Sequence, residues 1–303
     1  MMKTSVDHIP LRKQRELSRV VEILHEEFED ALKEGTAEFK KRGRILKIIL
    51  FGSYAKGSWV DEPFTMKGYR SDFDLLIIVN NRKLCDFATY WHKAADRIIR
   101  DNAIETPISF IVHSRREVNT FLKDGQYFFS DIRKEGVVLY ELDDEPLPEP
   151  QPLSALDRLR VAQRHYASRQ SLLRQFAEGA KFHISRGNYD VAAFDLHQSL
   201  EQAYSCVLLT LTNYAPPSHN IKFLRSLAEE QERRLAKVFP RDQHRERAWF
   251  NTLNEAYVKA RYSRHFDISE EALAWLADRA AVLVNLVDAV CAEQIQKLER
   301  DAD

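Results

Sequence analysis

Cysteine is scarce in this sequence. The three cysteines, Cys85, Cys206 and Cys291, stand far apart and form no CxxC pair. An odd number without that pattern fits reduced thiols in a cytoplasmic protein rather than a disulfide framework. Long apolar runs are also lacking, so no membrane span is expected. The N-terminal MMKTSVDHIPLRKQRE has no apolar core, so no signal peptide is expected either.

An excess of charge of one sign is missing as well. The 303 residues include 45 basic and 46 acidic side chains, for a net charge of −1. This balance argues against a strongly cationic nucleic-acid binder, although it allows a local basic face. Hydrophobic residues make up 44% of the chain, which is enough for the cores of one large domain or of two domains.

Glycine is nearly absent from the second half. Seven of the nine glycines lie at or before Gly136. Four of the ten prolines fall in DDEPLPEPQP, residues 143–152. Proline at every second position cannot continue a helix or pair in a central strand, so this segment is predicted to be a stiff, extended linker. The predicted organisation is a first domain over 1–142, a linker over 143–152 and a second domain over 153–303.

The two halves differ in hydrophobic periodicity. Before the linker, four short apolar runs predict strands at 45–51, 73–79, 108–112 and 137–142, and helical stripes cover 17–32, 84–99 and 115–123. The pattern is typical of an α+β domain built on a small mixed sheet. After the linker no strand is predicted. Five long amphipathic segments there predict an all-α helical bundle, at 153–186, 188–212, 220–237, 242–264 and 269–299.

The first predicted strand runs into Phe51-Gly52-Ser53-Tyr54-Ala55-Lys56-Gly57. Gly52 lets the backbone come close to a ligand, and the Ser53 hydroxyl can donate a hydrogen bond. A helix that starts here would add free N–H groups, so a phosphate can be bound at this point. The alternative is an ordinary turn, because Gly-Ser also occurs without any ligand.

The second predicted strand opens with Ser71-Asp72-Phe73-Asp74. Side chains two apart in a strand point to the same face, so Asp72 and Asp74 project together. Two adjacent carboxylates repel unless a cation lies between them, and hard oxygen ligands suit Mg²⁺. A solvated strand start is the plain alternative, but the LLIIV run that follows indicates a central strand.

Together these features are more specific. The stretch IILFGSYAKG…SDFDLLIIV resembles the polymerase-beta-like nucleotidyltransferase superfamily. The resemblance implies that Gly52 and Ser53 hold the triphosphate. Lys56 and Arg70 are further candidates for nucleotide contacts, although a solvated loop is the favoured interpretation of the segment that carries Arg70. The resemblance also implies that Asp72 and Asp74 hold Mg²⁺. The implied reaction moves a nucleoside monophosphate, expected to be AMP from ATP, to an acceptor hydroxyl.

Two departures from that superfamily matter. Its small members place the Asp-x-Asp pair closer to Gly-Ser, whereas 19 positions separate Ser53 from Asp72 here. The superfamily usually carries a third carboxylate on the next central strand, but the strand at 106–112 contains no acid. Ser109 holds that place in this interpretation, and Glu105 is the nearest acid and therefore the remaining candidate for a catalytic base.

The second half resembles the HEPN family of helical domains in three blocks, at 192–203, 218–224 and 256–262. HEPN domains often accompany minimal nucleotidyltransferases, and aminoglycoside nucleotidyltransferases carry a related bundle behind the same catalytic domain. Many HEPN domains are ribonucleases with an Arg and a His separated by a longer gap than the three residues between Arg261 and His265. On one helix, Arg261 and His265 would still share a face. His197 lies on the apolar face of its helix, which predicts a hydrogen-bonded core histidine.

Several alternatives stay open from the sequence. The acceptor of a transferase is a small molecule, such as an aminoglycoside, or a protein tyrosine. A second interpretation is a nucleotide-binding module without catalysis, which would control a HEPN ribonuclease in a toxin–antitoxin-like arrangement. A homodimer through the helical domain is expected. A basic cluster is expected to be a solvated face, with RNA contact as the less favoured alternative; it consists of Arg233, Arg234, Lys237, Arg241, Arg245 and Arg247.

Overall fold

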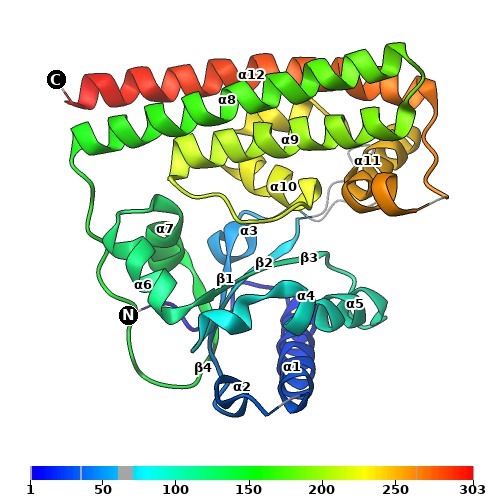
Figure 1. Cartoon of the computed structure of the whole chain (residues 1–303). Helices are drawn as coiled ribbons and strands as arrows, with labels where there is room; N and C mark the ends of the chain where they lie inside the picture. Colours follow the sequence, from blue (N-terminus) through cyan, green and yellow to red (C-terminus); the bar gives the residue numbers. More distant parts are fainter. Residues whose placement is uncertain (1, 35, 61–70, 264, 303) are drawn as a thin grey trace. The chain divides into compact units, whose positions relative to one another are not determined.

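A computed structural model describes residues 2–34, 36–60, 71–263 and 265–302 (Figure 1). The contacts within the chain divide these residues into two compact units, which meet in sequence between Pro152 and Leu153. Each unit buries its own set of apolar side chains.

The first unit contains a four-stranded sheet in the order β3-β2-β1-β4. Its strands are β1 (Ile45–Phe51), β2 (Phe73–Val79), β3 (Ile108–Ser114) and β4 (Val137–Glu141). The central strand β1 is antiparallel to both β2 and β4, whereas β2 and β3 are parallel. All seven residues of β1 and of β2 are buried, as continuous apolar runs predict for central strands. The small mixed sheet predicted from the sequence is confirmed.

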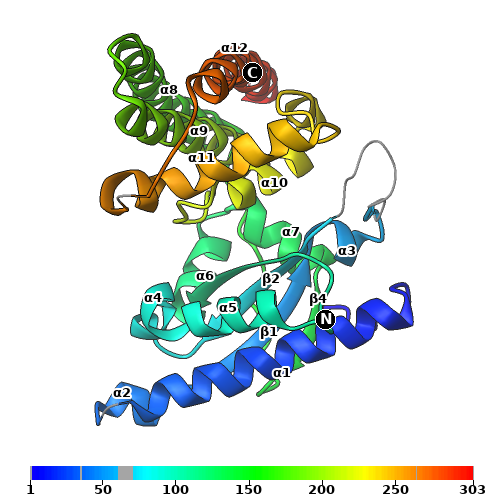
Figure 2. The ribbon, with the colours of Figure 1, turned by 90° about the vertical axis from the view of Figure 1, so that its right-hand side faces the viewer.

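Helices cover both faces of this sheet (Figure 2). On one face, α1 (Leu11–Lys33) and α5 (His92–Arg100) bury their apolar side chains with those of alternate strand positions, including Ile48 and Ile77. On the other face lie α6 (Arg115–Lys123) and α7 (Tyr127–Glu135), where the rings of Phe51 and Phe128 meet at 5.4 Å between centroids. The short helices α2 (Glu38–Lys41) and α3 (Gly52–Lys56) precede and follow β1.

The prediction of one helical stripe over 84–99 was wrong. The chain there forms a 3₁₀ turn (Arg82–Cys85), α4 (Phe87–Tyr90) and then α5. Asp86 caps α4 by accepting a hydrogen bond from the Thr89 N–H at 2.9 Å. Trp91 departs from helical geometry between α4 and α5. Its ring stacks on Phe28, and its indole N–H donates a hydrogen bond to a backbone carbonyl. The interruption changes the helical phase, so Ile99 points to solvent with 82% of its surface exposed.

The proline-rich segment 143–152 forms no helix or strand, and it belongs to the first unit. The Arg115 guanidinium of α6 pairs with the Asp143 carboxylate at 2.7 Å. Arg133 of α7 donates to the carbonyl oxygen of Leu147 at 3.1 Å, and that leucine is buried. The segment is therefore fixed against α6 and α7 rather than exposed along its length.

The second unit is an all-α bundle, which confirms the predicted class. Its helices are α8 (Ala155–Ser185), α9 (Tyr189–Thr212), α10 (Ile221–Gln231), α11 (His244–Tyr262) and α12 (Glu270–Ala302), with a 3₁₀ turn at Arg233–Lys237. The other four helices all pack on α9, which is therefore the centre of the bundle. Cys206 and Cys291 are buried in this core with their sulfur atoms 3.9 Å apart. None of the described helices combines the length and apolar character that a membrane span requires.

Candidate active site

The Gly-Ser turn lies directly at the end of a buried strand. β1 ends at Phe51, and α3, a single turn of helix, begins at Gly52. Gly52 has a φ of +70°, in the left-handed region that side chains with a Cβ adopt only with strain. The backbone therefore requires glycine at this point, independently of any ligand. Ser53 follows as the second residue of α3 and is half-buried.

Aromatic packing fixes the position of α3. Tyr54 is fully buried and stacks on Trp59 with ring centroids 5.3 Å apart, and it also contacts the ring of Phe73 at the start of β2. Beyond Trp59, the Ser71 N–H donates to the Val60 carbonyl at 2.8 Å, so the chain segments before and after 61–70 lie together. Arg70, the candidate for a phosphate contact in this segment, lies with the rest of 61–70 outside the described residues.

The strand register brings the acidic pair to the Gly-Ser turn. Asp74 of β2 is paired with Phe51 of β1, the residue immediately before Gly52. Asp74 is buried with 2% of its surface exposed, whereas Asp72, just before β2, is half-buried. Asp72 stands two residues before Asp74, a spacing that puts side chains on one face wherever the backbone stays extended. The residues predicted to bind phosphate and metal are thus adjacent in the fold.

A hydroxyl side chain, that of Ser109, stands beside Asp74 on the neighbouring strand. Ser109 of β3 is the residue paired with Asp74 in the parallel ladder, so the two side chains share one face of the sheet. Glu105 lies three residues before β3, where its carboxylate forms an ion pair with Arg12 of α1. The sequence-predicted acid therefore stands outside the ladder that joins Asp74 and Ser109.

A buried network anchors the segment that leads into β3. The Glu16 carboxylate of α1 accepts hydrogen bonds from the N–H groups of Glu105 and Thr106 at 3.1 and 2.8 Å. Lys13 lies 3.3 Å from the same carboxylate. Burial raises the pKa of Glu16, but the bonds from Thr106 and the charge of Lys13 outweigh it and hold the pKa below its usual value. This network positions the chain just ahead of Ser109.

Lys56 ends α3 and faces acids that the sequence did not single out. Its ammonium group lies 3.3 Å from the Glu135 carboxylate of α7, and both side chains are partly exposed. Burial raises the pKa of the neighbouring Asp131, and the charge of Lys56 opposes that rise. The helix that carries these acids was not predicted, although the spacing of Phe128, Phe129 and Ile132 is typical of a helix.

The oxygen atoms of the acidic pair fit a hard cation such as Mg²⁺. Among the described residues, no group of three or more His, Cys, Asp or Glu side chains could hold a metal. Mg²⁺ commonly binds through one or two carboxylates and takes its remaining ligands from water and substrate phosphates. Asp72 and Asp74 supply that number of carboxylates.

The proposed pairing of Arg261 and His265 on one helix was wrong. α11 ends at Tyr262, and His265 lies beyond it in the connection to α12. The Arg261 guanidinium instead lies over the rings of Phe194 and Tyr257, at 5.0 and 4.4 Å from their centroids. Its Nε donates to the Tyr257 carbonyl at 2.7 Å. A shared helix face, on which the ribonuclease interpretation depended, is therefore missing.

Three of the six residues of the basic cluster around α10 and α11 form ion pairs with acids. Arg234 pairs with Glu232 and Glu293, Arg241 with Glu229, and Arg245 with Glu271, all at 2.6–2.9 Å. These pairs use the positive charge within the domain, and they do not support an RNA-binding face.

The prediction that His197 is a satisfied core histidine is confirmed. Its side chain is fully buried in α9, and Nε2 lies 2.9 Å from the backbone carbonyl of His219. A carbonyl accepts, so Nε2 carries the proton. Burial is the main cause that lowers the pKa of His197, to about 4.

Stability of the helical unit is expected to fall as the pH drops from about 6.5 to 4. Below pH 6.5 the unfolded chain protonates His197, whereas the folded chain keeps it neutral until about pH 4. The free energy of unfolding is expected to fall by about 2 kcal/mol at pH 5, and the fall is expected to be nearly complete at pH 4. Urea unfolding of the wild type and of His197→Gln at pH 7 and pH 5 tests this. Equal pH dependence in the two proteins would contradict it.

Comparison with known proteins agrees with this arrangement. The HEPN domain family matches residues 174–290. A protein of Methanocaldococcus jannaschii named "Putative protein adenylyltransferase" is 35% identical over 114 residues, which are 38% of this chain and 92% of that protein. A crystal structure of a nucleotidyltransferase-like protein from Exiguobacterium sibiricum is 15% identical. The match covers 91% of this chain and 80% of that protein's chain, with a TM-score of 0.28.

The fold and the site define a nucleotidyltransferase domain followed by a HEPN domain. The chain belongs to the nucleotidyltransferase family represented by the Methanocaldococcus protein.

Proposed function

We propose that this chain transfers AMP from ATP to a hydroxyl group of an acceptor, with Mg²⁺ bound at Asp72 and Asp74. The observation that carries the proposal is the ladder position of Asp74, paired with the residue that precedes Gly52. This register supports the proposal, because it brings Asp74 beside the Gly52–Ser53 turn. The name of the Methanocaldococcus relative supports a protein acceptor, although a small molecule remains the alternative.

Each residue has a distinct part in the proposed reaction. Gly52 lets backbone approach the triphosphate, and the Ser53 hydroxyl donates to a phosphate oxygen. Asp72 and Asp74 would hold Mg²⁺. When bound, the metal ion lowers the pKa of an attacking hydroxyl and neutralises charge on the phosphates. Lys56 can turn from its exposed pair with Glu135 towards the phosphates, since such pairs contribute little stability.

The base is the weakest part of the site. A serine hydroxyl at position 109 is not a general base at neutral pH, and Glu105 is engaged by Arg12. This favours slow transfer, and it makes nucleotide binding without catalysis the second candidate function. In that case the first domain would act by reporting nucleotide occupancy to the HEPN domain.

The test is incubation of the purified protein with each α-labelled nucleoside triphosphate, Mg²⁺ and cell lysate. We expect label from ATP to appear on one acceptor, with release of pyrophosphate that EDTA abolishes. Protein gels and thin-layer chromatography separate a protein acceptor from a small one. Saturable ATP binding without pyrophosphate release would replace the transferase with the binding module. Cleavage of RNA that resists EDTA would replace both with a HEPN ribonuclease.

The homodimer through the helical domain stays a prediction.

A further inference from the structure

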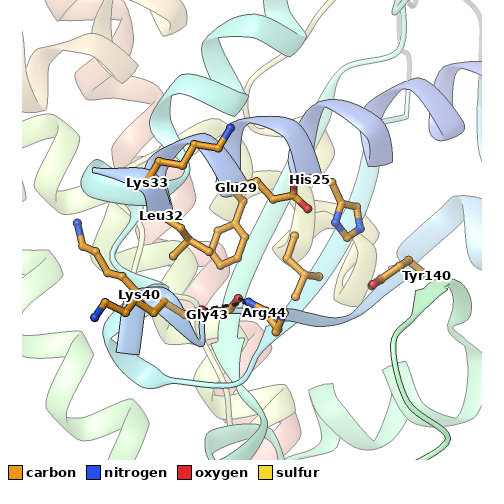
Figure 3. A pocket seen from close by; sticks show the side chains of 11 residues that line it. His25, Glu29, Leu32, Lys33, Lys40, Gly43, Arg44 and Tyr140 are labelled. Atoms are coloured by element: carbon orange, nitrogen blue, oxygen red, sulfur yellow. Dashed lines mark hydrogen bonds between the residues drawn. The ribbon is translucent and has the colours of Figure 1, made fainter. Parts of the chain in front are cut away.

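A pocket lies in the first unit, at the opposite end of β1 from Gly52. It has a volume of about 520 Å³, within the usual range for small-molecule sites. Its walls are the C-terminal half of α1, the residues around α2, and Tyr140 of β4 (Figure 3). Gly43 keeps the approach to β1 close to α1, since an added Cβ would lie only 2.8 Å from a methyl carbon of Leu32.

The lining of the pocket carries more basic than acidic side chains, in a chain that is nearly neutral. Four cationic side chains line it against one carboxylate, Glu29; the cations are Lys33, Lys40, Lys41 and Arg44. Lys33 pairs with Asp30, and Lys41 with Glu38, both outside the lining. The charged groups of Lys40 and Arg44 donate instead to backbone carbonyls at 2.6 Å, and no described carboxylate forms an ion pair with either. Their charge is therefore available to an anion.

The lining also has an apolar and aromatic part. Phe28 and Ile45 are buried beneath the pocket, next to the half-buried Leu32. His25 and Tyr140 form an edge-to-face pair with ring centroids 4.3 Å apart. In Figure 3 these two rings stand at one end of the pocket, whereas Lys33 and Lys40 stand at the other. The pocket is thus divided between a cationic end and an aromatic end.

We propose that this pocket binds a small phosphomonoester that carries a flat ring, of the size of a nucleoside monophosphate. The phosphate is held by Lys40 and Arg44, and the ring lies on the apolar floor towards His25 and Tyr140. Arginine and lysine are the usual phosphate contacts, while the apolar floor favours a ligand with a body beyond its phosphate. The site is separate from the Gly52–Asp74 region, because the full length of β1 lies between them.

The test is calorimetric titration in EDTA with AMP, adenosine, ribose 5-phosphate and inorganic phosphate. The protein carries Asp72→Asn and Asp74→Asn, so that metal-dependent binding near Gly52 does not contribute. We expect AMP to bind at one site, and each of the three fragments to bind at least about tenfold more weakly. If adenosine binds as tightly as AMP, the phosphate does not contribute to binding, and the proposal is wrong on that point. If ribose 5-phosphate binds as tightly as AMP, the ring does not contribute to binding, and that part of the proposal is wrong.

Arg44→Glu and Arg42→Glu form a matched pair of variants in that background. Both side chains are exposed, but only Arg44 lines the pocket. Arg44→Glu is expected to weaken AMP binding by about tenfold or more, because it replaces a phosphate donor with a repelling charge. Arg42→Glu is expected to leave it within about twofold, as an exposed charge away from the ligand is screened. Arg44→Gln and thermal unfolding curves exclude a folding defect. No AMP binding, or equal loss in both variants, would overturn the site.

Discussion

Replacing Asp74 or Asp72 by asparagine is expected to lower nucleotidyl transfer by about a hundredfold or more, equivalent to nearly 3 kcal/mol of transition-state stabilisation. The register joins Asp74 to the strand end that leads into Gly52, so the proposed metal ligands and the Gly-Ser turn are expected to act as one site. Each substitution removes a metal ligand and one negative charge while keeping the shape of the side chain. The two variants should therefore lose activity separately rather than only in combination.

The measurement is pyrophosphate release together with thermal unfolding, with and without Mg²⁺-ATP. The folds should survive, since a buried carboxylate is replaced by a neutral group of the same size. Without ligand, the variants should be as stable as the wild type or slightly more so, while the stabilisation by Mg²⁺-ATP disappears. Asp96→Asn on α5 is the control, since that carboxylate is exposed and outside the site. If both variants keep the wild-type ligand shift, the acidic pair is not a metal site.

The central strands could be predicted because their sequence leaves little choice. ILKIILF and FDLLIIV are continuous apolar runs of strand length, and such runs form strands that are covered on both faces. The helices of the second unit were equally clear, since their amphipathic segments are long, and glycine or proline separates all but the last two. The adjacency of the Gly-Ser turn and the acidic pair was inferred from the family pattern, and the register of β1 and β2 agrees with it.

What depends on contacts between distant segments could not be predicted. The position of Ser109 beside Asp74 follows from the register of two parallel strands, and sequence alone does not define a register. The end of α11 before His265 is a boundary error of the usual kind, but here it separated two residues that the ribonuclease interpretation needed together. The basic pocket combines α1, the α2 region and β4, which lie far apart in the chain.

Restoring the missing carboxylate with Ser109→Asp is expected to raise nucleotidyl transfer by about tenfold or more, since a positioned base or third metal ligand contributes at least that much. The new side chain would share a face with Asp74 on the neighbouring strand, about 4.8 Å away along the ladder. A carboxylate at the half-buried position 109 would repel that of the buried Asp74 when no cation is present. The variant should therefore be less stable than the wild type in EDTA and should gain more stability from Mg²⁺.

Thermal unfolding over a range of Mg²⁺ concentrations, paired with pyrophosphate release, measures both effects. Ser109→Asn is the matched control, because it adds nearly the same volume at the same position without a charge. The asparagine variant should show neither the loss of stability in EDTA nor the larger response to Mg²⁺. A rise in rate with Ser109→Asp alone would show that the absent carboxylate, as base or as third metal ligand, limits transfer in the wild type. If Ser109→Asp and Ser109→Asn respond equally to Mg²⁺, position 109 does not face the metal, and the base of this transferase must come from another residue.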